Sequence, residues 1–498
     1  MKAWDEYTMQ HEPIASIDLM ERAAQKVVEW IEQRNWKTRT IRIFCGRGNN
    51  GGDGLAVGRI LLQKGYNCFV YVIQNRRTGS PDFEANLKRI QTSSNNNVRF
   101  IAERNQLPFI EKDAIIIDAL FGSGLNKPVE GLNASVVDHL NRSGATIVSV
   151  DVPTGLFANE ASKGQQIIEA DFTLTFQSYK PALLIQENAA FIGNVHLLDI
   201  GLHPQFTPGT TDILIDDDLV RSLYRPRGRF AHKGNFGHAL LIAGSFGKMG
   251  AAVLAAKACL RAGVGLLSCF LPRCGYTIMQ AAVPEAMVMV DENETNIGQL
   301  PEEIEKYSVI GIGPGIGTAE TTQKMITFIV RRYRKPLVID ADALNCLSLQ
   351  KELLSILPPG SILTPHPKEF DRIFGNHQND FARIQTARKK AKDWNIIIVL
   401  KGHHSFIATP EQCYFNSTGN AGMAKGGSGD VLTGILTALM AQGYRPRDAA
   451  VFGVYMHGFA GDIAASALSE EGMLPSDLVS RLPEAFKSFS QQHRGDHH

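Results

Sequence analysis

Short runs of apolar, often β-branched residues alternate along the chain with longer segments in which apolar positions recur at helical spacing. This alternation predicts an α/β fold with mostly parallel strands. In the first part of the chain we expect strands at 40–45, 67–73, 113–120, 145–151 and 171–176, and a helix at 55–65. In the second part we expect strands at 238–244, 265–272, 308–315, 336–342, 361–367 and 395–402, and helices at 250–263 and 431–443.

A basic, proline-containing stretch at 220–237 separates the two series. We place a domain boundary near 212–225 and divide the chain into domains 1–215 and 216–498. The length of 498 residues suits two or three domains, at roughly 150 residues per domain. Because the two parts carry different motifs, the sequence predicts two unlike domains.

The charge balance and the cysteine pattern argue against several classes of protein. The 51 basic and 50 acidic residues leave a net charge of +1, so composition gives no reason to expect nucleic acid or an anionic membrane as a partner. The seven cysteines are scattered and contain no CxxC pair, which argues against a disulfide framework or a zinc site. No apolar run reaches about 18 residues, and the N-terminus is too polar for a signal peptide. We expect a cytoplasmic protein.

The first expected strand runs directly into a glycine-rich segment, GRGNNGGDG, at 46–54. Gly46, Gly48 and Gly51 match the G-x-G-x-x-G dinucleotide fingerprint in its strand–turn–helix context, with the helix expected from residue 55. That fingerprint also uses an acid at the end of the next strand. Here Arg76 and Arg77 follow that strand, with no carboxylate. The missing acid argues against a dehydrogenase, and the arginines suit an additional phosphate.

Polar side chains follow several expected strands of the first domain. Asn50 lies in the glycine segment, Asp118 ends one strand, and Asp151 and Thr154 follow another. Because the carboxyl ends of parallel strands line one crevice, we expect these four side chains to converge. Their oxygens suit a hard cation or a sugar hydroxyl. The alternative is that Asp118 and Asp151 only cap the next elements.

The second domain carries its strongest motif at 416–430, NSTGNAGMAKGGSGD, directly before an apolar helical pattern. Gly426, Gly427 and Gly429 allow the backbone to approach a ligand and to direct several N–H groups at one point. The helix N-terminus favours an anion there. The motif therefore predicts a phosphate site with Asp430 as general base, kept ionised by the helix N-terminus. The alternative is a glycine turn with Asp430 as the N-cap.

Other expected strands of the second domain also end in glycine-rich or polar motifs. Each motif alone is weak evidence for a functional site, because glycine turns are common in α/β proteins. Together the motifs bring polar groups to one edge of the sheet. The motifs are GSFGKMGAA at 244–252, GPGIG at 313–317, DADALN at 340–345, TPHPKEF at 364–370 and LKGHHSFIA at 400–408.

The sequence LKGHHS followed by a glycine segment ending in GGSGD and a helix resembles the ribokinase-like fold. With the other motifs, the second domain resembles the NAD(P)H-hydrate dehydratase branch. The first domain, with NNGGDG, DALFGSGL and DVPTG, resembles the NAD(P)H-hydrate epimerase module. The resemblance covers nearly the whole chain. It implies two three-layer αβα domains, an N-terminal Rossmann-like sheet at 1–215 and a C-terminal ribokinase-like sheet at 216–498.

For the second domain the resemblance implies that Asp430 is the catalytic base and that the preceding glycine loop is the anion hole. The alternative for His366 is a capping or packing residue. His366 and Glu369 form H-x-x-E where ribokinases usually carry N-x-x-E, so the handling of Mg²⁺ is open, and Ser405 stands where Thr is frequent. The implied ADP contacts are Lys401, Gly402, His403, His404, Ser405, Asn420, Ala421, Gly422, Met423, Ala424, Lys425, Gly426, Gly427, Ser428 and Gly429. The implied substrate contacts are Ala251, Gly315, His366 and Asp430.

For the first domain the resemblance implies a K⁺ site at Asn50, Asp118 and Thr154. Asp151 is expected to act as an acid–base group or to orient the substrate. The implied substrate contacts are Asn49, Asn50, Gly51, Gly52, Asp53, Gly122, Ser123, Gly124, Leu125, Asn126, Lys127, Pro128 and Asp151.

The function implied by the resemblance is repair of hydrated NADH and NADPH (NADHX and NADPHX). The first domain would interconvert the R and S hydrates. The second would transfer a phosphoryl group from ADP, with Mg²⁺, to the hydroxyl of the S form and eliminate phosphate, leaving AMP. We also expect a homo-oligomer. Two alternatives are a vitamin-type kinase fused to a nucleotide-sensing Rossmann-like module, and a non-enzymatic NAD(P)-binding assembly protein.

Overall fold

The computed structural model describes residues 1–490 apart from 75–77, 163, 208, 210–211 and 301–302. Arg76 and Arg77 therefore lie outside the described residues. The chain divides into two compact units, Met1–Gly209 and Thr210–His498. Across the described part of the chain, no helix has both the length and the apolar character needed to cross a membrane.

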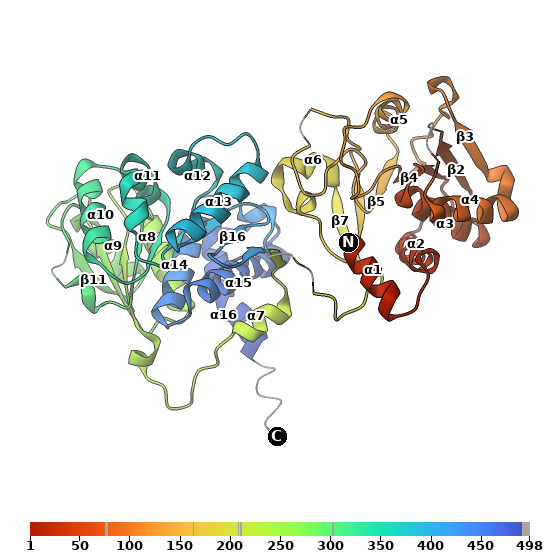
Figure 1. Ribbon diagram of the computed structural model, residues 1–498. Coiled ribbons are helices and arrows are strands. Elements are labelled where there is room, and N and C mark those ends of the chain that lie inside the picture. The colour runs from red at the N-terminus through yellow and green to blue at the C-terminus, as the bar shows by residue number, and fades with distance from the viewer. Residues whose placement is uncertain (75–77, 163, 208, 210–211, 301–302, 491–498) are drawn as a thin grey trace. The chain divides into compact units, whose positions relative to one another are not determined.

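The first unit is built on a parallel sheet of seven strands in the order β3-β2-β1-β4-β5-β6-β7 (Figure 1). Its strands are β1 (Ile41–Cys45), β2 (Cys68–Ile73), β3 (Val98–Ile101), β4 (Ile115–Ala119), β5 (Thr146–Val150), β6 (Phe172–Phe176) and β7 (Asn194–Leu198). Its α-helices are α1 (Lys2–His11), α2 (Ser16–Glu32), α3 (Asn49–Gln63), α4 (Pro81–Ser94), α5 (Gly131–Asn141) and α6 (Ala189–Ile192).

Alternating side chains of the central strand fill two cores. Ile41 and Ile43 of β1 pack in one cluster with apolar residues of α2 and α3. Phe44, which points to the other face, packs in a second cluster with Val136 and Leu140 of α5. Since each fully buried side chain of this kind contributes about 1.5–3 kcal/mol, both faces of the sheet must be covered. The first unit is therefore a three-layer αβα domain.

The second unit is built on a sheet of ten strands in the order β11-β10-β9-β12-β13-β14-β15-β16-β17-β8. Only the pairs β15–β16 and β16–β17 are antiparallel. The strands are β8 (Asp212–Leu214), β9 (His238–Ile242), β10 (Leu266–Leu271), β11 (Met287–Val290), β12 (Val309–Ile312), β13 (Leu337–Ile339), β14 (Ile362–Leu363), β15 (Ile397–Leu400), β16 (Phe406–Ala408) and β17 (Cys413–Phe415).

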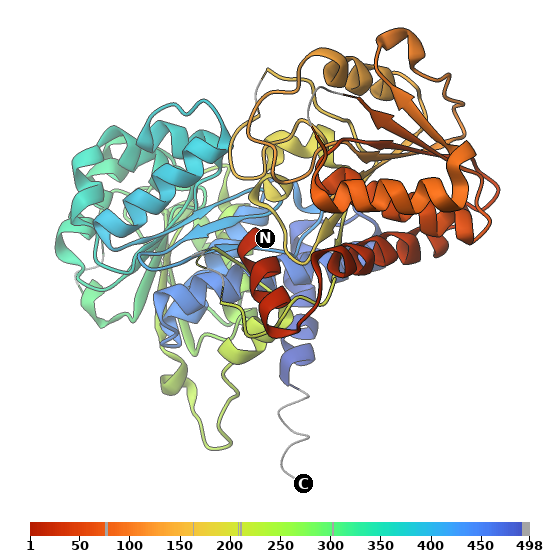
Figure 2. The same ribbon diagram turned by 45° about the vertical axis from the view of Figure 1, so that its right-hand side comes forward.

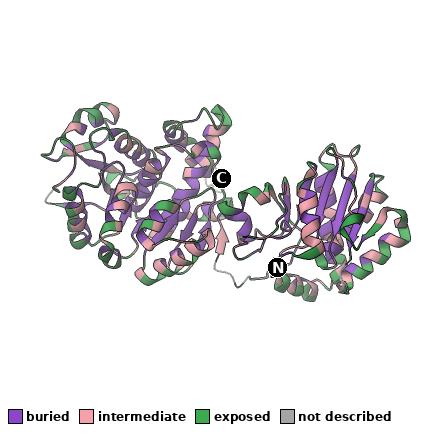
Figure 3. Ribbon diagram, turned by 90° about the horizontal axis from the view of Figure 1, so that it is seen from above, coloured by how far each residue is buried: buried purple, intermediate pink, exposed green. Residues whose placement is uncertain are grey.

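Helices cover both faces of this second sheet, and the central strands between them are buried (Figures 2 and 3). One face carries α8, α14, α15 and α16, whose apolar residues share one large core. The α-helices of the unit are α7 (Asp217–Leu223), α8 (Met249–Arg261), α9 (Tyr276–Ala282), α10 (Glu320–Arg332), α11 (Ala341–Leu349), α12 (Pro367–Phe374), α13 (Asp380–Trp394), α14 (Ser428–Ala441), α15 (Pro446–Leu468) and α16 (Pro475–Ser490).

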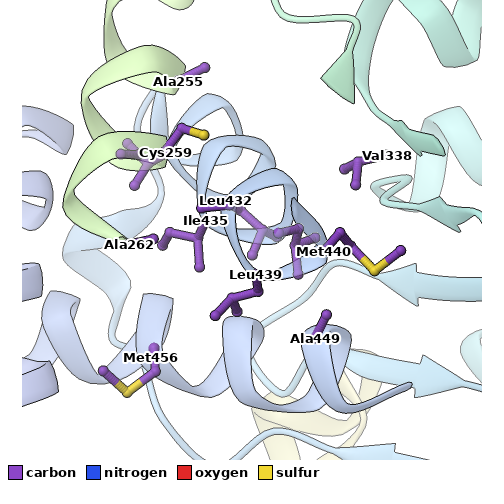
Figure 4. Packing of buried hydrophobic residues seen from close by; sticks show 14 of the residues in the cluster. Ala255, Cys259, Ala262, Val338, Leu432, Ile435, Leu439, Met440, Ala449 and Met456 are labelled. Carbon is purple, nitrogen blue, oxygen red and sulfur yellow. The ribbon is translucent and has the colours of Figure 1, made fainter. Parts of the chain in front are cut away.

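The contact between α8 and α14 fixes the helix that carries Asp430. Ala255 and Cys259 of α8 face Leu432 and Ile435 of α14 in a close-packed layer (Figure 4). Gly434 makes this approach possible, since a Cβ there would lie 2.2 Å from the carbonyl oxygen of Ala255. The N-terminus of α14 is thereby held rigidly at the edge of the sheet.

The predicted α/β class with mostly parallel strands is confirmed, and every strand expected from the sequence is present. The strands not predicted are β3, β7, β8, β11, β16 and β17. β3, β7 and β11 include exposed positions, so they lack the apolar run that indicates a buried parallel strand.

The predicted start of the first glycine-motif helix was wrong: α3 begins at Asn49, not at Leu55. The glycines themselves permit this early start. A Cβ at Gly51 would lie 1.8 Å from the carbonyl oxygen of Gly46, and one at Gly52 would lie 2.8 Å from Sδ of Met20. The segment 49–53 is therefore the first turn of a helix packed tightly against the end of β1.

Candidate active sites

In the second unit the predicted phosphate loop forms the N-terminus of α14. Gly427 is the N-cap, with a left-handed φ of +105°, and makes no side-chain cap. Asp430 is the third residue of the helix, so the alternative in which Asp430 is the N-cap is wrong. A Cβ at Gly427 would lie 2.7 Å from Cδ1 of Leu254. A glycine is thus required where the chain turns into the helix. The N–H of Ser428 donates to the carbonyl oxygen of Lys425 at 3.3 Å, so the N–H groups of Gly427 and Gly429 on either side of it are the candidates for contact with an anion.

A charged network joins this helix to two strand ends. Nζ of Lys401, at the end of β15, lies 2.7 Å from Oδ1 of Asp340, at the end of β13. The other carboxylate oxygen of Asp340 accepts a hydrogen bond of 2.8 Å from Oγ1 of Thr433 on α14. Nζ of Lys401 also lies 3.9 Å from Oε2 of Glu369. Burial opposes the charge of Lys401, but Asp340 and Glu369 outweigh it and raise its pKa.

The same network sets the charge of Asp430. Burial, together with the negative charge of Asp340, raises the pKa of Asp430 to about 6, while Lys401 acts in the opposite direction. The helix N-terminus was expected to keep Asp430 ionised, but desolvation is the largest influence on its pKa and acts in the opposite direction. A carboxyl group with this pKa is still mostly ionised at neutral pH, and it is well matched to a general base.

A half-buried histidine forms a hydrogen bond to the first residue of α14. Nε2 of His457, on α15, lies 2.9 Å from the carbonyl oxygen of Ser428. Burial lowers the pKa of His457 to about 4, so the ring is neutral and donates this hydrogen bond. No sequence motif pointed to His457, because it is the packing of α15 that brings its side chain next to Ser428.

His366 acts as a helix cap. Its Nδ1 accepts hydrogen bonds from the backbone N–H groups of Lys368 and Glu369, and Glu369 reciprocates by accepting from the backbone N–H of His366 at 2.9 Å. The capping alternative for His366 is thus confirmed. The cap fixes Glu369 in a buried position beside Lys401. Together with Asp430, Glu369 offers the carboxylate oxygens that Mg²⁺ takes besides nucleotide phosphates.

Two of the expected substrate-contact positions lie against each other. Gly315 has a left-handed φ of +66°, and a Cβ there would lie 3.2 Å from Cβ of Ala251 on α8. Oγ of Ser245 donates a 2.6 Å hydrogen bond to the carbonyl oxygen of Gly315. The GPGIG and GSFGKMGAA motifs therefore meet at one place, as the strand-end argument predicts.

Polar side chains of the two expected nucleotide segments make hydrogen bonds within the protein. Nδ1 of His404 lies 3.0 Å from the carbonyl oxygen of Asn416, which links the 401–405 turn to the glycine-rich segment. Asn420 donates to Asp462 at 2.9 Å. Nζ of Lys425 donates to the carbonyl oxygen of Met473 at 2.6 Å, so this ammonium group stabilises a loop.

In the first unit the expected substrate segments surround a cavity of about 1020 Å³. Gly51 and Gly52 do not line it and lie buried behind it in α3. The expected residues that do line it are Asn49, Asn50, Asp53, Gly122, Ser123, Gly124, Leu125, Asn126, Lys127, Pro128 and Asp151. Gly122 brings two of these together, because a Cβ there would lie 2.8 Å from Oδ2 of Asp151 and 3.1 Å from Oδ1 of Asn50.

Asp118 and Thr154 form a buried pair next to this cavity. Oγ1 of Thr154 donates to Asp118 at 2.7 Å and its backbone N–H at 2.9 Å. Asp118 also accepts from Leu120, the local contact expected of a cap. Burial raises the pKa of Asp118, and its partners among the described residues are neutral hydrogen-bond donors.

A monovalent cation suits this place. The carboxylate of Asp118 is completely buried without a charged partner in the described part of the chain, and buried charges are normally paired. Asn50 is nine-tenths buried, and its amide oxygen is of the kind that a hard cation takes as a ligand. Asp118 and Thr154, and Asn50 by its amide oxygen, thus offer the type of ligand that a cation such as K⁺ would take.

Asp151 is held in a strained position by a lysine that the sequence did not single out. Its φ is +69°, in the left-handed region that non-glycine residues rarely adopt. Nζ of Lys180 lies 2.6 Å from its Oδ1, and the backbone N–H of Ser123 donates to its Oδ2 at 2.8 Å. Burial acts to raise the pKa of Asp151, but Lys180 and Ser123 outweigh it and lower the pKa. Asp151 is thus a fixed carboxylate.

Each of the two units matches a known family model. Residues 239–484 match a family model described as NAD(P)H-hydrate dehydratase. Residues 16–182 match a family model described as the N-terminus of YjeF-related proteins.

Relatives of similar length match over nearly the whole chain. A bifunctional NAD(P)H-hydrate repair enzyme of Moorella thermoacetica is 36% identical over 502 residues, which cover 96% of this chain and 94% of the relative. One from Escherichia coli strain K12 is 32% identical over 469 residues, covering 93% and 88%. Among solved structures, a ribokinase-like superfamily protein of Enterococcus faecalis V583 aligns with a TM-score of 0.51 and 27% identity, over 58% of this chain and all of that one.

Proposed function

The chain belongs to the family of bifunctional NAD(P)H-hydrate repair enzymes, and from this premise we propose how its residues restore hydrated NADH and NADPH. We assign epimerisation of the R and S hydrates to the N-terminal domain, 1–215, and dehydration of the S hydrate to the C-terminal domain, 216–498. The compact units divide a few residues earlier, at Gly209, because β8 pairs with β17 of the second sheet.

For dehydration we propose that Asp430 takes the proton of the substrate hydroxyl while ADP transfers a phosphoryl group to the oxygen. Hydroxide is a poor leaving group and phosphate a good one, so the phosphorylated intermediate then loses phosphate and regenerates the double bond. The N–H groups of Gly427 and Gly429 at the start of α14 stabilise the charge on the phosphoryl group. The products are NAD(P)H, AMP and phosphate.

Lys401 and the two nucleotide segments are assigned to ADP. The ammonium group of Lys401 lies among Asp340, Glu369 and Asp430, where it keeps three carboxylates from repelling one another and from repelling phosphate. Glu369 and Asp430 would hold Mg²⁺, which supplies neutralisation of the nucleotide's charge. Ala251, Gly315 and His366 are assigned to the hydrated nicotinamide nucleotide.

For epimerisation we assign the substrate to the cavity of the first unit. The cavity volume of about 1020 Å³ is ample for a nucleotide. Asn50, Asp118 and Thr154 would hold K⁺, which supplies a counter-charge for the buried carboxylate of Asp118 and fixes the surrounding loops. Asp151 faces this cavity and is assigned to orient the substrate and to stabilise positive charge on it.

The observation that carries the proposal is the half-buried Asp430 at the N-terminus of α14, with Lys401 and Asp340 beside it. This arrangement joins a base to an anion site, which is what phosphorylation of a hydroxyl needs. The test is to incubate the protein with the S hydrate, ADP and Mg²⁺ and to follow NADH formation, AMP and phosphate together. Formation of a stable phosphorylated product without NADH would instead support a kinase.

We further propose a homo-oligomer in the cytoplasm, acting on small nucleotides. The described cysteines are all free thiols, and six of the seven are buried, as is usual for proteins of a reducing compartment. Light scattering of the purified protein tests the oligomeric state.

A further inference from the structure

The cavity of the first unit contains more acidic groups than the expected substrate segments supply. Asp5 of α1 and Asp82 of α4 line it together with Asp53 and Asp151. Asp151 is bound by Lys180 and Ser123, and Asp82 accepts a 2.6 Å hydrogen bond from Ser16. Asp5 and Asp53 accept no hydrogen bond from any described side chain or backbone group. Two carboxyl groups are therefore available to a substrate in this cavity.

The short helix α1 is held firmly enough to place Asp5 there. On one side of Asp5 in the sequence, Nε1 of Trp4 donates to the carbonyl oxygen of His203 at 2.9 Å. On the other side, the completely buried Thr8 accepts from the backbone N–H of His203 at 2.9 Å. The rings of Trp4 and Phe206 stack with centroids 5.4 Å apart. These contacts tie α1 to the segment after β7, so Asp5 is a fixed part of the cavity wall.

The charged groups around Asp5 favour a carboxyl group that exchanges its proton near neutral pH. Burial raises the pKa of Asp5 to about 6, with Asp151 and Glu6 acting in the same direction and the amino terminus and Lys180 in the opposite one. Asp53, which also faces Asp5, has a pKa raised well above its usual value by burial and by Asp151, Asp5 and Asp82. With a pKa of about 6, Asp5 can both give and take a proton near neutral pH.

The chemistry of the substrate requires such a group. Addition of water to the electron-rich double bond beside the ring nitrogen places the hydroxyl on the carbon bonded to that nitrogen. This carbon inverts if the hydroxyl receives a proton and leaves as water, while the nitrogen lone pair forms a C=N⁺ bond. Water then adds to the other face and returns one proton. One proton is consumed and one released, and no oxidant or reductant is needed.

We propose that Asp5 is the proton-transferring group of the epimerase: its carboxyl group protonates the departing hydroxyl and takes the proton back when water returns. Asp151, fixed as a carboxylate by Lys180, stabilises the cationic ring between the two steps. This inference rests on the proposed epimerase function of the first unit. It explains why Asp151 is bound on both oxygens while Asp5, on a different element, is not.

The test compares Asp5→Asn with wild type, and uses Glu6→Gln as the matched control. Glu6 is exposed next to Asp5 on α1 and pairs only at 3.8 Å with Lys2. Each protein receives the pure R hydrate, and formation of the S hydrate is followed by chromatography after subtraction of the spontaneous rate. We expect Asp5→Asn to lower kcat at least about fiftyfold, the scale of a lost general acid, with KM changed less than about threefold. Glu6→Gln should keep kcat within about threefold of wild type, because Glu6 acts on Asp5 only through its charge.

Two further measurements separate proton transfer from a structural effect. The wild-type rate should fall as the pH rises above the pKa of Asp5, and this limb should be missing in Asp5→Asn. Formate should restore several-fold activity to Asp5→Ala, because a small acid can occupy the space of the lost side chain. An Asp5→Asn rate within threefold of wild type, or a loss that formate does not relieve in Asp5→Ala, would overturn the role of Asp5. Wild-type protein that does not interconvert the hydrates would instead overturn the epimerase assignment itself.

Discussion

Nζ of Lys401 lies 2.7 Å from Oδ1 of Asp340, and this ion pair joins the ends of β13 and β15 to the helix that carries the candidate base. Asp340 is almost completely buried, and its second oxygen is held by Thr433, one turn after Asp430 on α14. The position and the charge of Asp430 are thus set by residues from three separate elements. The following predictions examine this arrangement and its counterpart in the first unit.

Asp430→Ala should lower the rate of dehydration at least about a hundredfold, the scale of a lost general base. Conversion of R to S hydrate by the same protein should stay at the wild-type rate, since Asp430 belongs to the second unit. NADH formation from the S hydrate with ADP measures the first activity, and chromatography of the epimers measures the second. Near-normal dehydration by this variant would remove Asp430 from the mechanism.

The pH dependence of dehydration should follow the ionisation of Asp430. A general base works only when deprotonated, so kcat/KM should be constant above about pH 7 and should fall as the pH decreases through the pKa of about 6. Lys401 lowers that pKa, so Lys401→Met should move the fall to higher pH, whereas Lys401→Arg should not. An acid limb at the same pH in all three proteins would show that Lys401 does not set the charge of Asp430.

Lys180→Met should slow epimerisation at least about tenfold and spare dehydration, because it leaves the strained carboxylate of Asp151 without its 2.6 Å ion pair. Lys180 also donates to Thr175 and to the carbonyl oxygen of Phe176. Lys180→Arg keeps the charge and should recover part of the rate. A thermal melt of each variant serves as the control for folding. Equal losses in both activities would indicate a general defect, contrary to this prediction.

Replacement of K⁺ by tetramethylammonium should lower the thermal midpoint of the wild-type protein and its rate of epimerisation. The buried charge of Asp118 would then lack a counter-charge. Asn50→Ala removes one proposed ligand and should weaken the response to K⁺ by at least about tenfold in the concentration required, about 1.4 kcal/mol of binding. A wild-type protein that is indifferent to K⁺ in both measurements would exclude the site.

The sequence could predict the parts of the fold that are continuous along the chain. Apolar runs located the buried strands, and the motifs after them located most of the cavity wall in the first unit, from Gly122 to Pro128. The same reasoning placed the glycine-rich turn and Asp430 next to a helix N-terminus, where the structure has them at the start of α14. The start of α3 was misplaced, because a run of glycines is typical of a loop. Only the structure shows the close approach of Gly51 to Gly46 that allows a helix there.

Residues that act across the fold were not predictable in this way. Lys180, Asp5 and His457 lie in segments without glycine or strand-end motifs, and each reaches its site through packing of a distant element. Lys180 meets a residue 29 positions earlier in the chain. The pKa of Asp430 could not be predicted from the sequence for the same reason. The helix N-terminus favoured a low pKa, whereas burial and the neighbouring Asp340, which is distant in the sequence, raise it.

The most direct test of the account is to mix the protein with R and S NADH hydrate, K⁺, Mg²⁺ and ADP, then ATP in a parallel sample, and to follow NADH by absorbance. We predict that ADP drives conversion of both epimers to NADH, with one AMP and one phosphate formed for each NADH. Conversion that stops when the S form is consumed would contradict the epimerase assignment. No NADH with either nucleotide would contradict the repair function as a whole.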